Sequence, residues 1–242
     1  MNRYILVLIS IFFYANLYCQ TGIHIKVGLQ TIYRNVYNDK IFRGGNNLVY
    51  GIEIDQILLK NEKRQLSFAT GVTHFKNEFQ YDGFLQVSEE STVSQTCLQT
   101  PFVIRYSFNP FPLINRFQIY IGSGIESNYI LNHKIREWAL DQFQVNNFIY
   151  SFEQDIKGST PKFRNFYRIE FGARYKNFLF QFSYSKSLKN YYIGNFEELV
   201  PEWESIFSLY PRLHRSQGYK ERFITVSLGY LLFYSKKSVE KF

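Results

Sequence analysis

The sequence predicts an all-β fold, a closed antiparallel transmembrane β-barrel of about eight strands. Apolar and polar residues alternate in eight separate segments, which is the period of a strand with two unlike faces. The connections between these segments are alternately long and short. Aromatic residues are dense, with 25 Phe and 20 Tyr in 242 residues, yet no second apolar run is long enough for a membrane-spanning helix.

The N-terminal residues 1–19 have the features of a secretory signal peptide. Arg3 precedes an apolar stretch over residues 4–15, which is too short to cross a bilayer as a helix. Tyr18 stands where a lipoprotein signal requires a small residue, so we expect cleavage after Cys19, with lipidation of Cys19 as the alternative. The mature chain, residues 20–242, is then one barrel domain with Cys97 as its single cysteine and no intramolecular disulfide.

The first four segments, residues 23–34, 48–55, 66–73 and 98–108, each place apolar side chains on one face and polar ones on the other. The apolar positions are Ile23, Ile25, Val27, Leu29 and Tyr33; Leu48, Tyr50, Ile52 and Ile54; Leu66, Phe68 and Val72; Leu98, Phe102, Ile104, Tyr106 and Phe108. The positions between them are mostly polar, charged or glycine. One face of each strand therefore suits lipid and the other suits water.

The last four segments, residues 117–129, 167–175, 178–185 and 224–232, repeat the pattern. Their apolar positions are Phe117, Ile119, Ile121, Ile125 and Tyr129; Tyr167, Ile169, Phe171 and Tyr175; Phe178, Phe180, Phe182 and Tyr184; Ile224, Val226, Leu228, Tyr230 and Leu232. A soluble lipocalin-like barrel or a sandwich would show the same alternation, so the connections must distinguish these folds.

With the N-terminus in the periplasm, the long connections all fall on the outside. They are residues 35–47, 77–93, 130–163 and 188–221, whereas the short periplasmic turns are 59–65, 109–116 and 176–177. Long external loops with short periplasmic turns are typical of outer-membrane barrels of Gram-negative bacteria. Residues 138–152 suit either a short helix or an extended hairpin, and the latter leaves a ten-stranded barrel open.

Aromatic side chains stand at both ends of the predicted lipid face. The loop-side set is Tyr33, Tyr50, Tyr129, Tyr167 and Tyr184, and the turn-side set is Phe108, Phe117, Tyr175 and Phe178. Two such girdles are expected at the two membrane interfaces.

The charged residues of the inner face form the main candidate site. They are Lys26, Arg34, Glu53, Asp55, Arg105, Glu126, Arg168, Glu170 and Arg174. Five positive and four negative charges nearly balance, and the lumen of an eight-stranded barrel holds little more than its own side chains. We therefore expect a neutralising network rather than an ion channel or a binding site.

No pattern of catalytic or metal-binding residues stands out, so we expect no enzymatic activity, cofactor or metal. The four histidines are dispersed; His74 with Ser67 or Thr73 is the one candidate for a lipid-modifying enzyme, the alternative class. Cys97 is expected to point inward as a small buried thiol. Glu197, Glu198, Glu202 and Glu204 could hold a divalent cation but suit a solvated acidic loop better.

The segment Leu98-Gln99-Thr100-Pro101-Phe102-Val103-Ile104-Arg105-Tyr106, followed by Asn109-Pro110 and Gly122-Ser123-Gly124, resembles an outer-membrane β-barrel domain family of Bacteroidetes. That family includes PorT-like proteins and has small barrels of the OmpX or OmpA kind. The resemblance implies a cell-envelope protein with a structural, interaction or secretion-accessory role. Gln99 stands where the family usually has a glutamate.

Partners are expected at the external loops, because a barrel wall is committed to lipid. Trp138, Tyr150, Trp203 and Tyr210 are large amphipathic side chains of the kind that anchor interfaces. The net charge of +8 is scattered, which favours lipopolysaccharide phosphates over nucleic acid as counterpart. The barrel-assembly machinery is the expected partner during insertion.

Overall fold

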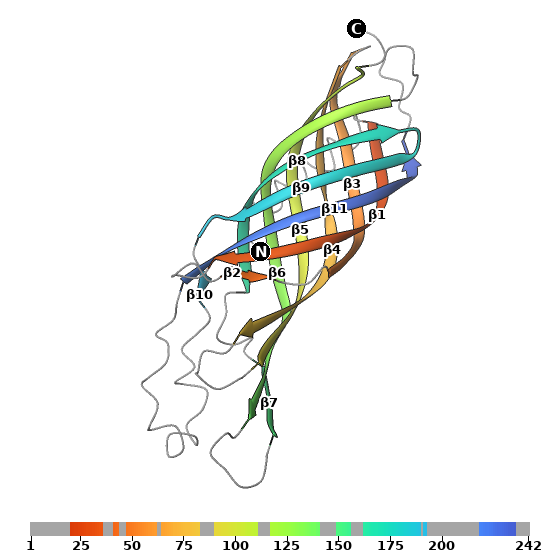
Figure 1. Ribbon diagram of the computed structural model, residues 1–242. Coiled ribbons are helices and arrows are strands. Elements are labelled where there is room, and N and C mark those ends of the chain that lie inside the picture. The colour runs from red at the N-terminus through yellow and green to blue at the C-terminus, as the bar shows by residue number, and fades with distance from the viewer. Residues whose placement is uncertain are drawn as a thin grey trace, which may run out of the picture.

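The computed structural model describes residues 20–35, 41–43, 47–61, 64–82, 90–110, 117–140, 149–155, 162–189, 191–192 and 218–235. The predicted signal peptide, the acidic run 197–204, Trp203 and Tyr210 lie outside these residues. All regular structure within them is β-strand (Figure 1). In the described part of the chain, no helix is long and apolar enough to cross a membrane.

Eight strands form the wall of a closed barrel. They are β1 (Gln20–Asn35), β3 (Asn47–Lys60), β4 (Arg64–Asp82), β5 (Glu90–Phe108), β6 (Phe117–Leu140), β8 (Phe163–Tyr175), β9 (Phe178–Ser187) and β11 (Gly218–Tyr234). Each pairs antiparallel with the next, and β1 pairs with β11 from Gly22 opposite Tyr234 to Asn35 opposite Lys220. The all-β antiparallel barrel of eight strands is thus confirmed.

Three short strands lie outside this ring: β2 (Ile41–Arg43) on β1, β7 (Ile149–Asp155) on β6, and β10 (Tyr191–Tyr192) on β11. Each pairs with a single wall strand along an extension of the wall, so the alternative of a ten-stranded barrel is wrong. Residues 138–140 pair with 149–151, so the described parts of the stretch 138–152 form an extended hairpin and not a helix.

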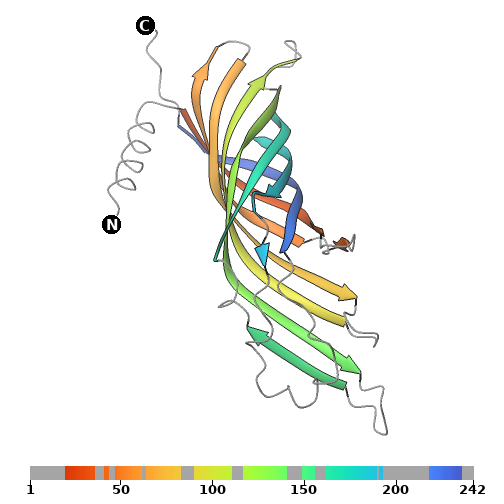
Figure 2. The same ribbon diagram turned by 90° about the vertical axis from the view of Figure 1, so that its left-hand side faces the viewer.

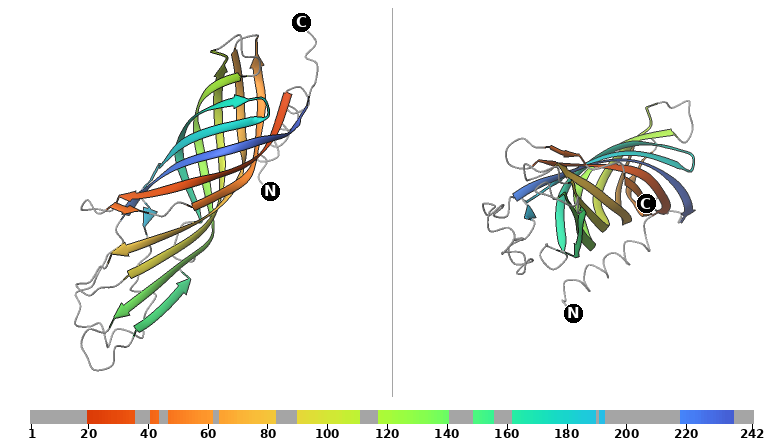
Figure 3. Two further views of the ribbon diagram at one scale, coloured as in Figure 1. Left: turned by 45° about the vertical axis from the view of Figure 1, so that its right-hand side comes forward. Right: turned by 60° about the horizontal axis from the view of Figure 1, so that its bottom comes forward.

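We call the end of the barrel with the short turns the turn side and the opposite end the loop side. Strands β4, β5 and β6 continue well past the barrel on the loop side, where β7 joins them (Figures 1 and 2). The expected loops 77–93 and 130–163 are therefore wrong in extent, because strand pairing persists to Asp82–Glu90 and to Leu140–Ile149. Figure 3 shows this extension from two further directions.

The two faces of the wall are opposite in character, as the alternation predicts. In β8, exposed and buried residues alternate from Phe163 to Glu170. Among the described residues, twenty-five polar or charged side chains are buried against twelve apolar ones, while large apolar side chains are exposed on every wall strand. A soluble barrel would bury its apolar face, so this molecule has the opposite distribution.

Candidate functional site

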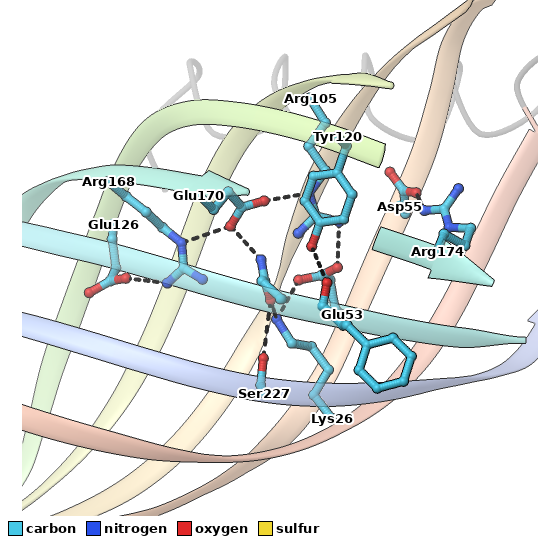
Figure 4. A network of polar contacts seen from close by, with 12 residues as sticks. Lys26, Glu53, Asp55, Arg105, Tyr120, Glu126, Arg168, Glu170, Arg174 and Ser227 are labelled. Carbon is cyan, nitrogen blue, oxygen red and sulfur yellow. Dashed lines mark hydrogen bonds and ion pairs between the residues drawn. The ribbon is translucent and has the colours of Figure 1, made fainter. Parts of the chain in front are cut away.

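A chain of ion pairs crosses the turn-side half of the lumen (Figure 4). Lys26 Nζ on β1 lies 2.7 Å from Glu53 Oε2 on β3, and the other oxygen of that carboxylate lies 2.5 Å from Arg105 Nη1 on β5. Arg105 Nε also donates a hydrogen bond to Glu170 on β8. One guanidinium therefore joins carboxylates from two different strands, a geometry that suits its planar set of donors.

Arg168 extends this chain towards the loop side. Its Nε lies 3.0 Å from Glu170 Oε2 and its Nη1 lies 2.6 Å from Glu126 Oε2 on β6. The Ser185 hydroxyl of β9 donates a further hydrogen bond of 3.0 Å to the Glu126 carboxylate. Towards the turn side, Arg174 forms a separate ion pair with Asp55.

Gln181 and Tyr120 complete the network, although neither was among the predicted site residues. The Gln181 amide on β9 accepts a hydrogen bond from Lys26 and donates one to Glu170. The Tyr120 ring lies 4.9 Å from the Arg105 guanidinium, within the range of a cation–π contact. An amide can join a cation and an anion at once because it has both a donor and an acceptor.

Gly122 leaves the space in which two of these side chains meet. A Cβ atom added at this position would lie 3.1 Å from Cγ of Arg105, 3.1 Å from Cγ of Glu170 and 2.8 Å from Cγ1 of Val103. The inward glycine is thus part of the site, since any larger residue would push against the stems of the ion pair.

The described charges of the network balance. Lys26, Arg105, Arg168 and Arg174 face Glu53, Asp55, Glu126 and Glu170, and all but the half-buried Arg174 are buried. The remaining predicted member is Arg34, whose side chain lies outside the description; its backbone pairs with Glu221. Buried charges are tolerated only when paired and hydrogen-bonded, so a balanced set can fill a lumen that a single unpaired charge could not.

A second ion pair lies nearer the loop side. Arg164 Nη1 on β8 lies 2.8 Å from Glu221 Oε1 on β11, and both side chains are buried. We did not predict this pair because residues 164 and 221 were assigned to loops or their edges. Extending the alternation by three residues at the start of each of these two segments would have placed both on the inner face.

Inside the lumen, an apolar layer separates the Arg164–Glu221 pair from the ion pairs around Arg105. It consists of Ile32, Val49, Phe75, Cys97, Ile130, Phe166 and Phe223, from seven of the eight wall strands. Val49, Phe75, Cys97 and Ile130 form one cluster. The Phe223 ring lies 6.0 Å from Phe75 and 4.9 Å from Phe166, and Ile32 is directly opposite Phe223.

The inner face, which the sequence predicts to be mostly polar, is therefore apolar at this level, next to or beyond the ends of the predicted segments. Cys97 is buried within the apolar layer, as expected for a small buried thiol. Between this layer and the ion pairs, a small cavity bordered by Val49, Gln99 and Arg168 has room for no more than about one water molecule. Side chains of the ion-pair network and of the apolar layer occupy successive levels of the described lumen.

The other predicted residues take separate positions. His74 is on the outer face, where its ring lies 5.0 Å from the Tyr50 ring, while Ser67 and Thr73 belong to the alternate, inward set of β4. The proposed grouping of His74 with either residue is thus wrong, because successive side chains of a strand point to opposite faces. No cluster of metal-ligating side chains occurs among the residues that the structure describes.

The girdle residues lie on the outer face wherever their side chains are described. Tyr50, Tyr167, Phe108, Tyr175 and Phe178 are exposed, and Tyr129, Tyr184 and Phe117 are half-buried. Tyr129 packs against Phe163 at 4.9 Å on the loop side, and Phe178 against Tyr230 at 5.4 Å on the turn side. The side chains of Tyr33, Trp138 and Tyr150 are outside the description, but the backbones of the last two lie in the β6–β7 hairpin.

Neither a family model nor a curated protein matches the chain. Several solved structures align with most of it. Ail, the attachment invasion locus protein of Yersinia pestis, aligns over 88% of this chain and 99% of its own, with 13% identity and a TM-score of 0.32. Neisserial surface protein A aligns over 87% and 97% with 9% identity and a TM-score of 0.35. The outer membrane protease OmpT of Escherichia coli aligns over 88% and 96% with 10% identity and a TM-score of 0.39.

Proposed function

We propose that this chain is an integral outer-membrane β-barrel protein without enzymatic activity, which is anchored by its wall and contacts other molecules through its loops. The observation that carries the proposal is the apolar outer face of a closed barrel. Ile52, Ile104, Ile121 and Phe180 are each more than half exposed, and they come from four different strands. Such a surface around a closed sheet is stable in lipid and would aggregate in water.

Membrane insertion tests this proposal directly. The purified chain should insert into phosphatidylcholine vesicles during refolding and should then migrate differently on electrophoresis with and without boiling. In intact cells it should fractionate with the outer membrane and require detergent for release. Recovery in the soluble periplasmic fraction would refute the proposal and favour a lipocalin-like binding protein.

The filled lumen supports a structural role over a transport role. The ion-pair network and the apolar layer occupy successive levels of the described lumen, which argues against a continuous path for hydrated ions. Planar-bilayer recordings of the refolded chain should show no stable conductance. Regular conductance steps would contradict this part of the proposal.

A role through the loops follows from the arrangement of the long strands. The β6–β7 hairpin carries Trp138 and Tyr150 beyond the barrel, whereas the described turn at 176–177 is too short for recognition. Photo-reactive residues at Tyr150 and Trp203 should capture a partner in intact cells. Capture only from the turn-side Asn115 would instead favour a periplasmic, secretion-accessory role of the PorT kind.

The alternative of a lipid-modifying enzyme can be tested by analysing lipid A. Lipid A from cells with and without the protein should have the same mass spectrum if the chain is not an enzyme. Loss of an acyl or sugar group that depends on His74 would refute the non-enzymatic proposal.

A further inference from the structure

Acidic and basic side chains are distributed differently on the two faces of the barrel. Among the acidic side chains that the structure describes, Glu53, Asp55, Glu126, Glu170 and Glu221 are buried. The sixth, Glu78, is exposed and lies 2.7 Å from Lys76. The outer face therefore has described lysines and arginines with few carboxylates to balance them.

Three of these cations form a group near the loop-side end of β9 and β11. Lys186 is directly opposite Arg222 in the strand pairing, and Lys220 is two residues before Arg222 on the same face. All three point outward, because Ser185, Ser187 and Glu221, which alternate with them, are buried. We call Lys186, Lys220 and Arg222 the cation cluster.

The cation cluster lacks a counter-charge within the described structure. Like charges directly opposite each other in a sheet repel, which destabilises the pair. An anion bound between these cations relieves their repulsion, so the arrangement indicates an anion supplied from outside the chain.

The depth of the cluster indicates which anion is available. The next outward pair towards the turn side is Ile224 with Tyr184, and Tyr167 on β8 is directly opposite Lys186. Aromatic side chains of this kind mark the membrane interface, so the cluster lies level with lipid headgroups. On the loop side these are the headgroups of the outer leaflet, if the chain is oriented as its long loops indicate.

We infer that Lys186, Lys220 and Arg222 bind a phosphate group of the surrounding outer-leaflet glycolipid, lipid A. The inference rests on the proposed outer-membrane location and adds a ligand and its site. Two ammonium groups and one guanidinium supply charge-assisted hydrogen bonds to phosphate oxygens, and the neighbouring tyrosines suit the sugar and upper acyl region. The bound phosphate would neutralise the repulsion between Lys186 and Arg222.

The test compares two triple variants of the full chain refolded in a zwitterionic detergent. The cluster variant carries K186Q, K220Q and R222Q. The control carries K60Q, R64Q and K176Q, which removes the same two lysines and one arginine from exposed positions on the turn side. Binding of diphosphorylated lipid A is measured by native mass spectrometry or fluorescence titration, with dephosphorylated lipid A and phosphatidylglycerol as competing ligands.

We expect the cluster variant to bind diphosphorylated lipid A at least about tenfold more weakly than the unmodified chain. The control should lose less than about twofold, since exposed single charges contribute little. Equal binding by the cluster variant, an equal loss in the control, or equally tight binding of dephosphorylated lipid A or phosphatidylglycerol would each overturn the inference.

Insertion into phosphatidylcholine vesicles separates this inference from the proposed function. Both triple variants change only exposed or half-buried outward residues, so both should insert and shift on heating as the unmodified chain does. If the unmodified chain fails to insert, the proposed location is wrong. If all three chains insert and bind lipid A alike, the location stands and the phosphate site is refuted.

Discussion

The inner and outer faces of the same strands differ in the side chains that they carry: the inner face buries paired charges, and the outer face exposes apolar groups. On β5, Arg105 is buried and joins two carboxylates, while its neighbour Ile104 is more than half exposed on the outer face. A soluble protein would place these two residues the other way round. The comparison shows that alternation alone defines two faces, and that the lumen's ability to pair its charges decides which face is inside.

The largest expected effect comes from leaving a lumen charge unpaired. Arg105→Met removes the cation between Glu53 and Glu170, so two buried carboxylates lose a shared partner. The free energy of unfolding in vesicles, measured by urea titration, should fall by about 3–5 kcal/mol. The matched change Lys76→Met, in an exposed ion pair, should cost at most about 1 kcal/mol. Equal losses for the two variants would mean that the lumen network is solvated.

The outer face should respond to an added charge. Ile121→Arg places a cation on the apolar outer face of β6, where Ile121 is 57% exposed. The expected loss of unfolding free energy is about 2–4 kcal/mol if this residue is near the bilayer midplane. The control is Lys186→Arg at the loop-side interface, which keeps the charge there and should be nearly neutral. A neutral result for Ile121→Arg would contradict the lipid-facing assignment.

These two predictions concern residues whose faces were predictable from sequence. Strand alternation placed Glu53 and Arg105 inside and Ile104 and Ile121 outside, because the period of a strand fixes the face once one member is assigned. The register between strands was not predictable in the same way. That Lys26 meets Glu53 rather than another carboxylate depends on the register between β1 and β3, which neither segment specifies by itself.

The loop-side end was predicted least well, for a physical reason. Phe75, Ile130, Phe166 and Phe223 lie on the inner face, just beyond the ends of segments whose inner positions were predicted to be mostly polar. An apolar side chain inside the lumen is stable when the side chains that pack against it are apolar too. Which side chains these are depends on the height along the barrel axis at which each strand places its residues. A single segment shows which face a residue lies on, but not its height along the barrel axis. The apolar layer and the Arg164–Glu221 pair therefore follow from the pairing between strands and not from any one segment.

A smaller effect should follow from filling the space beside the network. Gly122→Val adds atoms that must displace the stems of Arg105 and Glu170, and overpacking of this kind costs about 1–3 kcal/mol. The matched variant is Ser123→Val on the outer face of the same strand, where the side chain is exposed and extra carbon atoms have room. Unfolding titrations in vesicles should show a loss for the first variant only. A loss of the same size in both would indicate a general effect on β6.

The smallest expected effect is a gain in stability at the turn between β8 and β9. Lys176 has φ of 53°, in the left-handed region that non-glycine residues rarely adopt, and it is the first residue of a two-residue hairpin turn where glycine is preferred. Lys176→Gly removes this steric cost, and although glycine loses more entropy on folding, we expect a net gain of up to about 1 kcal/mol in unfolding free energy. The variant also removes a contact between the Lys176 ammonium and the Tyr175 ring, 5.2 Å apart. Lys176→Met removes the same contact without relieving the backbone, so it should be neutral or slightly destabilising. If the methionine variant gained as much as the glycine variant, the strain at this turn would not limit the stability of the barrel.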